Sequence, residues 1–161
     1  MRYYIDTEFN GSGGQPISIA LVRQDGAAFY EVLHLHELVA PWVAEHVMPW
    51  LDKTPEDRAT ITKRLQKFLR KDEGPHSFIA DWPEDFVHFF NLLMRGHGRR
   101  NDPMQLRCLM LDLPGFDTAS ASARPHNALA DAECLMAYVE AHLRGERAEM
   151  CAADLAMLAG A

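Results

Sequence analysis

The stretch that decides the fold is Tyr3-Tyr4-Ile5-Asp6-Thr7-Glu8-Phe9, in which apolar and aromatic residues carry two acids spaced at i and i+2. Side chains alternate between the two faces of a β-strand, so Asp6 and Glu8 project from the same face. Two like charges about 4 Å apart repel by roughly 4 kcal/mol at an effective dielectric of 20. The pattern therefore indicates a metal site. The competing interpretation is a strand end whose acids point to solvent.

The composition is that of a soluble globular protein, with 48% hydrophobic and 24% charged residues in a chain of 161. This length predicts a single domain over 1–161, with 146–161 as a C-terminal helical extension. No apolar run approaches the roughly 18 residues that span a membrane, so we expect a cytoplasmic protein with no membrane partner. The net charge of −7 argues against a generic polyanion-binding surface. The negative net charge does not exclude a nuclease, because bound divalent cations would reverse the sign of the charge at a metal site.

The three cysteines, Cys108, Cys134 and Cys151, are odd in number and far apart. This usage is more typical of buried free thiols in a reducing compartment than of a disulfide framework. We assign them no catalytic role.

Hydrophobic periodicity and turn residues predict an α/β domain with a mixed sheet, in which three antiparallel strands open the chain. The expected strands cover 3–9, 16–23, 28–35, 76–80 and 106–111. The expected helices cover 41–48, a segment capped by Thr54, 86–94, 127–143 and 147–158, and a loop covers 112–123.

Further acids follow later in the chain. Asp85 lies at a strand-to-helix junction, where sites form in open α/β sheets, although it could simply complement the helix dipole. Asp81 competes with it for the same role. If Asn127 caps the last long helix, His126 lies just outside that helix and Asp131 lies among its apolar positions. An acid in such a place is costly unless it is paired or metal-bound, whereas His126 could also be an ordinary surface residue.

The order of these residues resembles the DEDDh 3′-5′ exonucleases, a superfamily with a ribonuclease H-like fold. The resemblance rests on Asp6-Thr7-Glu8-Phe9 and on His126-Asn127-Ala128-Leu129-Ala130-Asp131-Ala132. It implies a mixed sheet of three antiparallel strands followed by parallel strands, flanked by helices. The superfamily often has Asn four residues before its third acid, and that position is Asp81 here. We therefore match Asp85 to the third acid, with the ranking of Asp81 and Asp85 left open.

Within this superfamily, the opening strand and His46-Val47-Met48-Pro49 are similar to the short exoribonucleases of the ribonuclease AS type. That similarity implies trimming of adenylate-containing RNA from the 3′ end of a single strand, and a homodimer.

The residue types fit the implied mechanism. Asp6, Glu8, Asp85 and Asp131 are hard oxygen ligands that suit two Mg²⁺ or Mn²⁺ ions, which would clamp the scissile phosphate. His126 would be the general base, because a histidine with its ordinary pKa of about 6.5 can accept a proton at neutral pH.

Residues beside the acids are candidates for substrate binding. Thr7, Phe9 and Trp82 could hold the terminal nucleotide, the rings by stacking, and Asp81 adjoins them. Trp82 could equally be a core or junction residue. Candidate phosphate contacts are Arg95, Arg99, Arg100, Arg107 and Arg124.

The sequence thus favours a metal-dependent 3′-5′ exoribonuclease. The alternatives are a DNA exonuclease, which the sequence does not distinguish, and a non-catalytic module that binds nucleic acid or protein on the same fold.

Overall fold

The computed structural model describes residues 1–72, 74–94, 105–113, 115–146 and 158. They form an α/β structure around a five-stranded mixed sheet of order β3-β2-β1-β4-β5. β1 (Arg2–Phe9), β2 (Pro16–Arg23) and β3 (Ala28–Val32) are antiparallel neighbours, whereas β4 (His76–Ala80) runs parallel to β1 and β5 (Leu106–Met110) runs parallel to β4. The predicted mixed sheet, opened by three antiparallel strands, is therefore confirmed.

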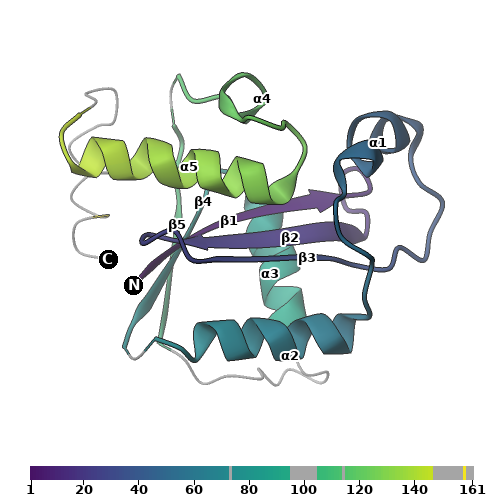
Figure 1. Cartoon of the computed structure of the whole chain (residues 1–161), viewed down its shortest axis with the longest axis horizontal. Coiled ribbons are helices and arrows are strands. Elements are labelled where there is room, and N and C mark those ends of the chain that lie inside the picture. The colour runs from purple at the N-terminus through teal and green to yellow at the C-terminus, as the bar shows by residue number, and fades with distance from the viewer. Residues whose placement is uncertain (73, 95–104, 114, 147–157, 159–161) are drawn as a thin grey trace.

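Helices cover both faces of the sheet (Figure 1). α5 (Ala128–Leu143) lies on one face, and α2 (Arg58–Leu69) and α3 (Pro83–Leu93) lie on the other. Each helix buries an apolar stripe, as amphipathic surface helices do. No described helix is long and apolar enough to cross a membrane.

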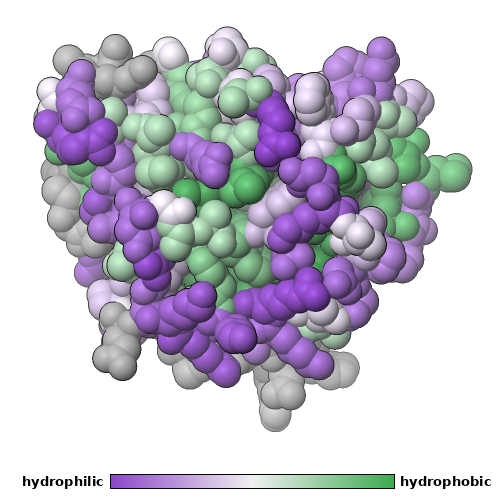
Figure 2. Space-filling model, in the orientation of Figure 1, coloured by the Kyte–Doolittle hydropathy of each residue, from purple (hydrophilic) through white to green (hydrophobic). Residues whose placement is uncertain are grey.

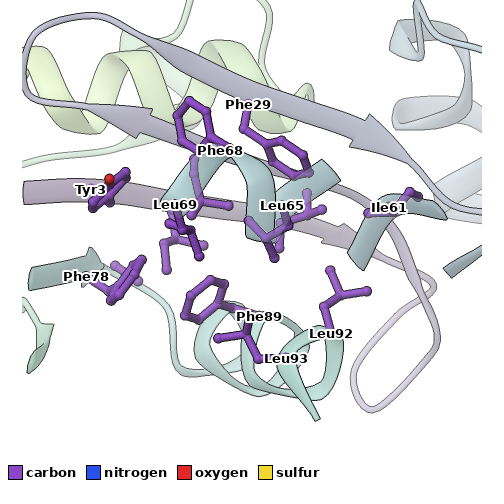
Figure 3. Close-up of a cluster of buried hydrophobic side chains, with 14 of the residues drawn as sticks. Tyr3, Phe29, Ile61, Leu65, Phe68, Leu69, Phe78, Phe89, Leu92 and Leu93 are labelled. Carbon is purple, nitrogen blue, oxygen red and sulfur yellow. The ribbon is translucent and has the colours of Figure 1, made fainter. Parts of the chain in front are cut away.

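The alternation of side chains along β1 assigns its residues to the two layers. Tyr3 and Ile5 are fully buried in the core that α2 and α3 cover (Figure 3), whereas Tyr4 packs with Leu135 of α5. With a period of two, Asp6 and Glu8 face the α5 side and Thr7 faces the α3 side. The register shifts between Glu8 and Phe9, and the Phe9 ring also lies on the α3 side, where it contacts His88. One strand thus supplies side chains to both layers at its carboxyl end.

Two short helices, α1 (Pro41–His46) and the 3₁₀ helix η1 (Met48–Trp50), lie beside the carboxyl end of β1 (Figure 1). Asn10, just after β1, ties this region to the strand. Its Nδ2 donates to the Leu38 carbonyl at 2.8 Å, and its Oδ1 accepts from the Ala40 amide at 2.7 Å. The chain that leads into α1 is therefore fixed to the turn that follows β1.

Several predicted boundaries were wrong. β3 ends at Val32 rather than at residue 35, and the first short helix ends at His46, with Pro49 inside η1. Asp57, not Thr54, caps α2, because Glu56 is held in a bridge with Leu33. The predicted loop 112–123 contains α4 (Thr118–Ala121).

The expectation of buried cysteines was also wrong. Cys108 is exposed, because it lies on the edge strand β5, and Cys134 is half-buried. Cys151, the basic turn at 95–100 and most of the expected helix 147–158 lie outside the described residues. Leu158 is described, and it is buried against Leu135 and Val139 of α5.

Candidate metal centre and active-site cleft

A cleft of about 470 Å³ opens at the carboxyl end of β1, between the first turns of α3 and α5. Carboxyl ends of strands and helix N-termini are where sites form in open α/β sheets. Four acids that the sequence singled out line this cleft together with Asp81, and the full lining is Asp6, Thr7, Glu8, Phe9, Gly11, Trp42, Val43, Asp81, Trp82, Asp85, Thr118, His126 and Asp131.

Three of the acids form one compact group. Asp6, Glu8 and Asp131 each offer a carboxylate oxygen, and these oxygens all lie within 4.8 Å of one another. Asp6 and Glu8 reach the group from β1, and Asp131 reaches it from the first turn of α5. Asp131 is buried, and the other two are half-buried. Oxygen donors at this spacing form a suitable ligand set for a hard divalent cation.

Oxygens of three cleft acids are buried and have no hydrogen-bond partner within the described part of the chain. They are Asp6 Oδ2, Asp85 Oδ2 and Asp131 Oδ1. Buried carboxylate oxygens are ordinarily paired, because an unpartnered charge in a low-dielectric site is costly. A divalent cation would satisfy these atoms, so the residues present fit such an ion.

Asp85 approaches the cleft from the α3 side, where Thr7 of β1 holds it. The Thr7 amide donates to Asp85 Oδ1 at 2.9 Å, and the Thr7 hydroxyl donates to the same oxygen at 2.7 Å. Asp85 is only 2% exposed. Both donors converge on one oxygen, which leaves Oδ2 without a partner among the residues that the structure describes.

The acids raise one another's pKa values. Burial, reinforced by the charges of Asp131 and Asp85, raises the pKa of Glu8 to about 8. Burial also raises the pKa of Asp85 to about 7, although the Thr7 hydrogen bonds oppose the shift. The pKa of Asp6 lies well above its ordinary value, through burial and then through repulsion from its acidic neighbours. Burial likewise raises the pKa values of Asp131 and Asp81. Clustered perturbed carboxyl groups are characteristic of functional sites.

His126 lies at the mouth of the cleft in an unusual backbone conformation, with a φ of 66°. Its amide donates to Asp131 Oδ2 at 3.0 Å. Its ring meets Trp42 edge to face at a centroid distance of 5.0 Å, and Trp42 stacks on His46 at 4.6 Å. Backbone strain of this kind is kept where surrounding contacts hold it, often at functional sites.

The start of α5 is fixed by Asn127, which caps the helix as predicted. Its Oδ1 accepts from the Ala130 amide, and its Nδ2 donates to the Trp50 carbonyl at 2.9 Å. Asn127 is fully buried. This residue therefore joins η1 to α5 and fixes the position of the adjacent His126.

On the opposite side of the cleft, Trp82 is exposed and is the N-cap residue of α3, so it lies at the strand-to-helix junction and not in the core. Its indole N–H donates to Glu84 at 3.1 Å, and the other oxygen of Glu84 accepts from the Gly13 amide at 2.8 Å. The Phe9 ring also lines the cleft and contacts His88 at 5.1 Å. Exposed hydrophobic residues also gather at the α1 end of the molecule (Figure 2).

Sequence reasoning missed four lining residues: Gly11, Trp42, Val43 and Thr118. Only Trp42 carried a signal, as an isolated tryptophan beside a helix-starting proline.

Of the arginines predicted to contact phosphate, Arg124 and Arg107 are described, and neither lines the cleft. Among the described lining residues there is no arginine or lysine; Arg124 pairs with Asp52 at 3.0 Å, and Arg107 lies on β5. Arg95, Arg99 and Arg100 lie outside the described residues.

The chain matches no protein-family model and no curated protein sequence.

Proposed function

We propose that this protein is a metal-dependent 3′-5′ exoribonuclease that removes nucleotides from the 3′ end of single-stranded RNA. The observation that carries the proposal is the group formed by Asp6, Glu8 and Asp131, whose carboxylate oxygens lie within 4.8 Å of one another. Unpartnered buried oxygens on Asp6, Asp85 and Asp131 support it. Phosphodiester hydrolysis needs such an oxygen-rich cation site.

The fold supports the same proposal. We propose a ribonuclease H-like arrangement, because an antiparallel β3-β2-β1 unit continues into parallel β4 and β5 with helices on both faces. The similarity of the opening strand to ribonuclease AS-type enzymes extends the proposal to adenylate-rich RNA and to a homodimer. Light scattering at micromolar concentration tests the homodimer, and a stable monomer would reject it.

The acids would hold Mg²⁺ or Mn²⁺ at the carboxyl end of β1. When bound there, such a cation lowers the pKa of water and neutralises charge on phosphoryl oxygens. Asp6, Glu8 and Asp131 supply ligand oxygens, and Asp85 contributes its unpartnered Oδ2. Their raised pKa values mean that cation binding also displaces protons from the site.

His126 would accept the proton of the attacking water at the cleft mouth. The hydrogen bond from its amide to Asp131 and the contact of its ring with Trp42 hold it in place. The exposed ring of Trp82 and the half-buried ring of Phe9 offer flat surfaces on which a terminal base can stack.

The test is digestion of 5′-labelled single-stranded RNA with Mg²⁺ or Mn²⁺, with a chelator control. We expect stepwise shortening from the 3′ end, no cleavage of the same RNA in circular form, and loss of activity on Asp131→Asn substitution. The matched control is Glu133→Gln, an exposed acid on the same helix, which should retain activity. Cleavage in chelator, or full activity of Asp131→Asn, would reject the proposal.

Two further arms address the alternatives. Single-stranded DNA of the same sequence should be degraded more slowly than RNA; the opposite order would make the protein a DNA exonuclease. RNA binding without any cleavage in either metal would favour a non-catalytic module.

A further inference from the structure

A second cleft of about 400 Å³ lies close to the first, between the start of β2 and helices α2 and α3. Its volume falls in the range of small-molecule sites. It is lined in part by Leu33, Leu92 and Pro16, and in part by Arg58 and three histidines, His34, His36 and His88. No step of the proposed reaction uses these residues.

His88 on α3 is the most informative of them. It is 5% exposed, and neither ring nitrogen has a hydrogen-bond partner within the described residues. Burial lowers its pKa, so the ring is neutral at pH 7 and offers one donor and one acceptor. Buried polar atoms are rarely left unpaired, and two on one ring that lines a cleft point to a ligand.

The other lining groups indicate what this ligand is. Arg58 supplies a guanidinium at the cleft, where one of its NH₂ groups donates to the Asn91 carbonyl and its remaining donors suit a phosphate. His34 and His36 are exposed, and their ring centroids lie 6.4 Å apart, so each can stack on a flat heterocycle. Asp57, the one acid among the described lining residues, is already engaged, because it accepts hydrogen bonds from the Thr60 amide and hydroxyl.

The second cleft is separated from the first by a pair of rings. Phe9 lines the first cleft, His88 lines the second, and the two rings are in contact. We propose that the second cleft is a nucleotide-binding subsite, in which His88 pairs with a base edge and Arg58 contacts a phosphate. The nucleotide is either a free mononucleotide or an upstream residue of the same RNA strand, and this second source rests on the function proposed above.

The first experiment does not depend on catalysis. 5′-AMP is titrated into the full chain in chelator, so that no cation can link its phosphate to the acids of the first cleft, and the ring ¹⁵N shifts of His88 are followed. We expect saturable shifts, with affinity about tenfold weaker in Arg58→Gln because one charge-assisted hydrogen bond is lost. Lys67→Gln, which removes an exposed charge elsewhere on α2, should bind like wild type. His88→Phe, checked for folding by circular dichroism, should also bind more weakly.

The second experiment identifies the source of the nucleotide. With oligoadenylates of increasing length, an upstream subsite predicts that KM falls with length and that Arg58→Gln removes this gain while kcat is unchanged. A length-independent Arg58→Gln effect, combined with AMP binding, assigns the subsite to the free mononucleotide.

Absence of AMP-induced shifts at His88 up to millimolar concentration, together with unchanged KM values in Arg58→Gln, would overturn the subsite. That result is separable from failure of the nuclease proposal. RNA digestion without AMP-induced shifts at His88 and without a KM change in Arg58→Gln rejects only the subsite. AMP binding without RNA digestion rejects only the nuclease.

Discussion

Thr7 donates both its amide and its hydroxyl to one oxygen of Asp85, at 2.9 and 2.7 Å. The two residues are 78 positions apart, and the contact joins the central strand to the first turn of α3. It holds a buried carboxylate with one oxygen satisfied and the other, Oδ2, without a described partner. The position of the Asp85 carboxylate is therefore fixed by contacts on the α3 side of β1.

Replacing Thr7 by Val should destabilise the protein. The substitution removes the hydroxyl donor and leaves a buried carboxylate less satisfied, which costs about 1 to 3 kcal/mol. Urea unfolding in chelator at pH 8, where Asp85 is ionised, measures the change in the free energy of unfolding. Thr7→Ser keeps the hydroxyl and should lie closer to wild type. Equal stability of the two variants would show that this hydrogen bond is dispensable.

Divalent cations should stabilise the wild-type protein. Mg²⁺ or Mn²⁺ at one hundred times its Kd contributes about 2.7 kcal/mol, which corresponds to a rise in Tm of about 5 to 10 °C. At pH 7 without metal, Glu8→Gln should show a higher Tm, because ionisation of Glu8 in the wild-type protein favours the unfolded state, and it should show little further rise with metal. Glu133→Gln serves as the control and should respond like wild type. A rise of the same size in Glu8→Gln would exclude Glu8 as a ligand.

The metal-free protein should lose stability relative to Glu8→Gln as pH rises. The folded pKa of Glu8, about 8, lies above its ordinary value of 4.5, so between these pH values the folded state binds more protons than the unfolded state. Stability contributed by this group therefore declines through that window. Unfolding free energies from pH 5 to pH 9 in chelator measure the difference, and a gap between the two proteins that is constant with pH would contradict it.

Trp42 should act as a positioning residue for His126. Trp42→Leu removes the ring that meets the His126 ring edge to face, and an aromatic contact of this kind is worth about 0.5 to 1.5 kcal/mol. We expect kcat on RNA to fall about three- to tenfold with a shifted pH profile, compared with about 10² to 10⁴ for His126→Ala. Trp42→Phe keeps a ring and should recover most activity. If Phe and Leu behave alike, the ring contact has no such role.

Asp85 and Asp81 should differ as cation ligands. Asp85 carries a buried unpartnered oxygen, whereas no Asp81 oxygen is both buried and unpartnered. Asp85→Asn should weaken Mn²⁺ binding at least about tenfold more than Asp81→Asn does. Isothermal titration calorimetry measures both. The reverse order would make Asp81 the third acid of the site.

The parts of this structure that local patterns specify were predictable. The alternation in β1 and the Asn127 cap of α5 placed Asp6, Glu8 and Asp131 correctly on their elements. The start of α2 could not be predicted in this way, because Thr54 and Asp57 are both good capping residues. The pairing of Glu56 with Leu33 decides between them.

Contacts between distant segments could not be read from the sequence. The position of Trp42 over the cleft depends on the hydrogen bonds of Asn10 to the segment before α1. The attachment of Asp85 to Thr7 depends on how α3 packs beneath β1. Neither relationship leaves a periodic or capping signal.

The two-sided use of β1 makes this strand intolerant of insertions and deletions. Removing Ile5 would reverse the facing of the strand residues on one side of the deletion, so that either Tyr3 leaves the core or Asp6 and Glu8 turn into it. Both outcomes damage the core, so we expect a shortened β1 not to yield a folded, inactive protein.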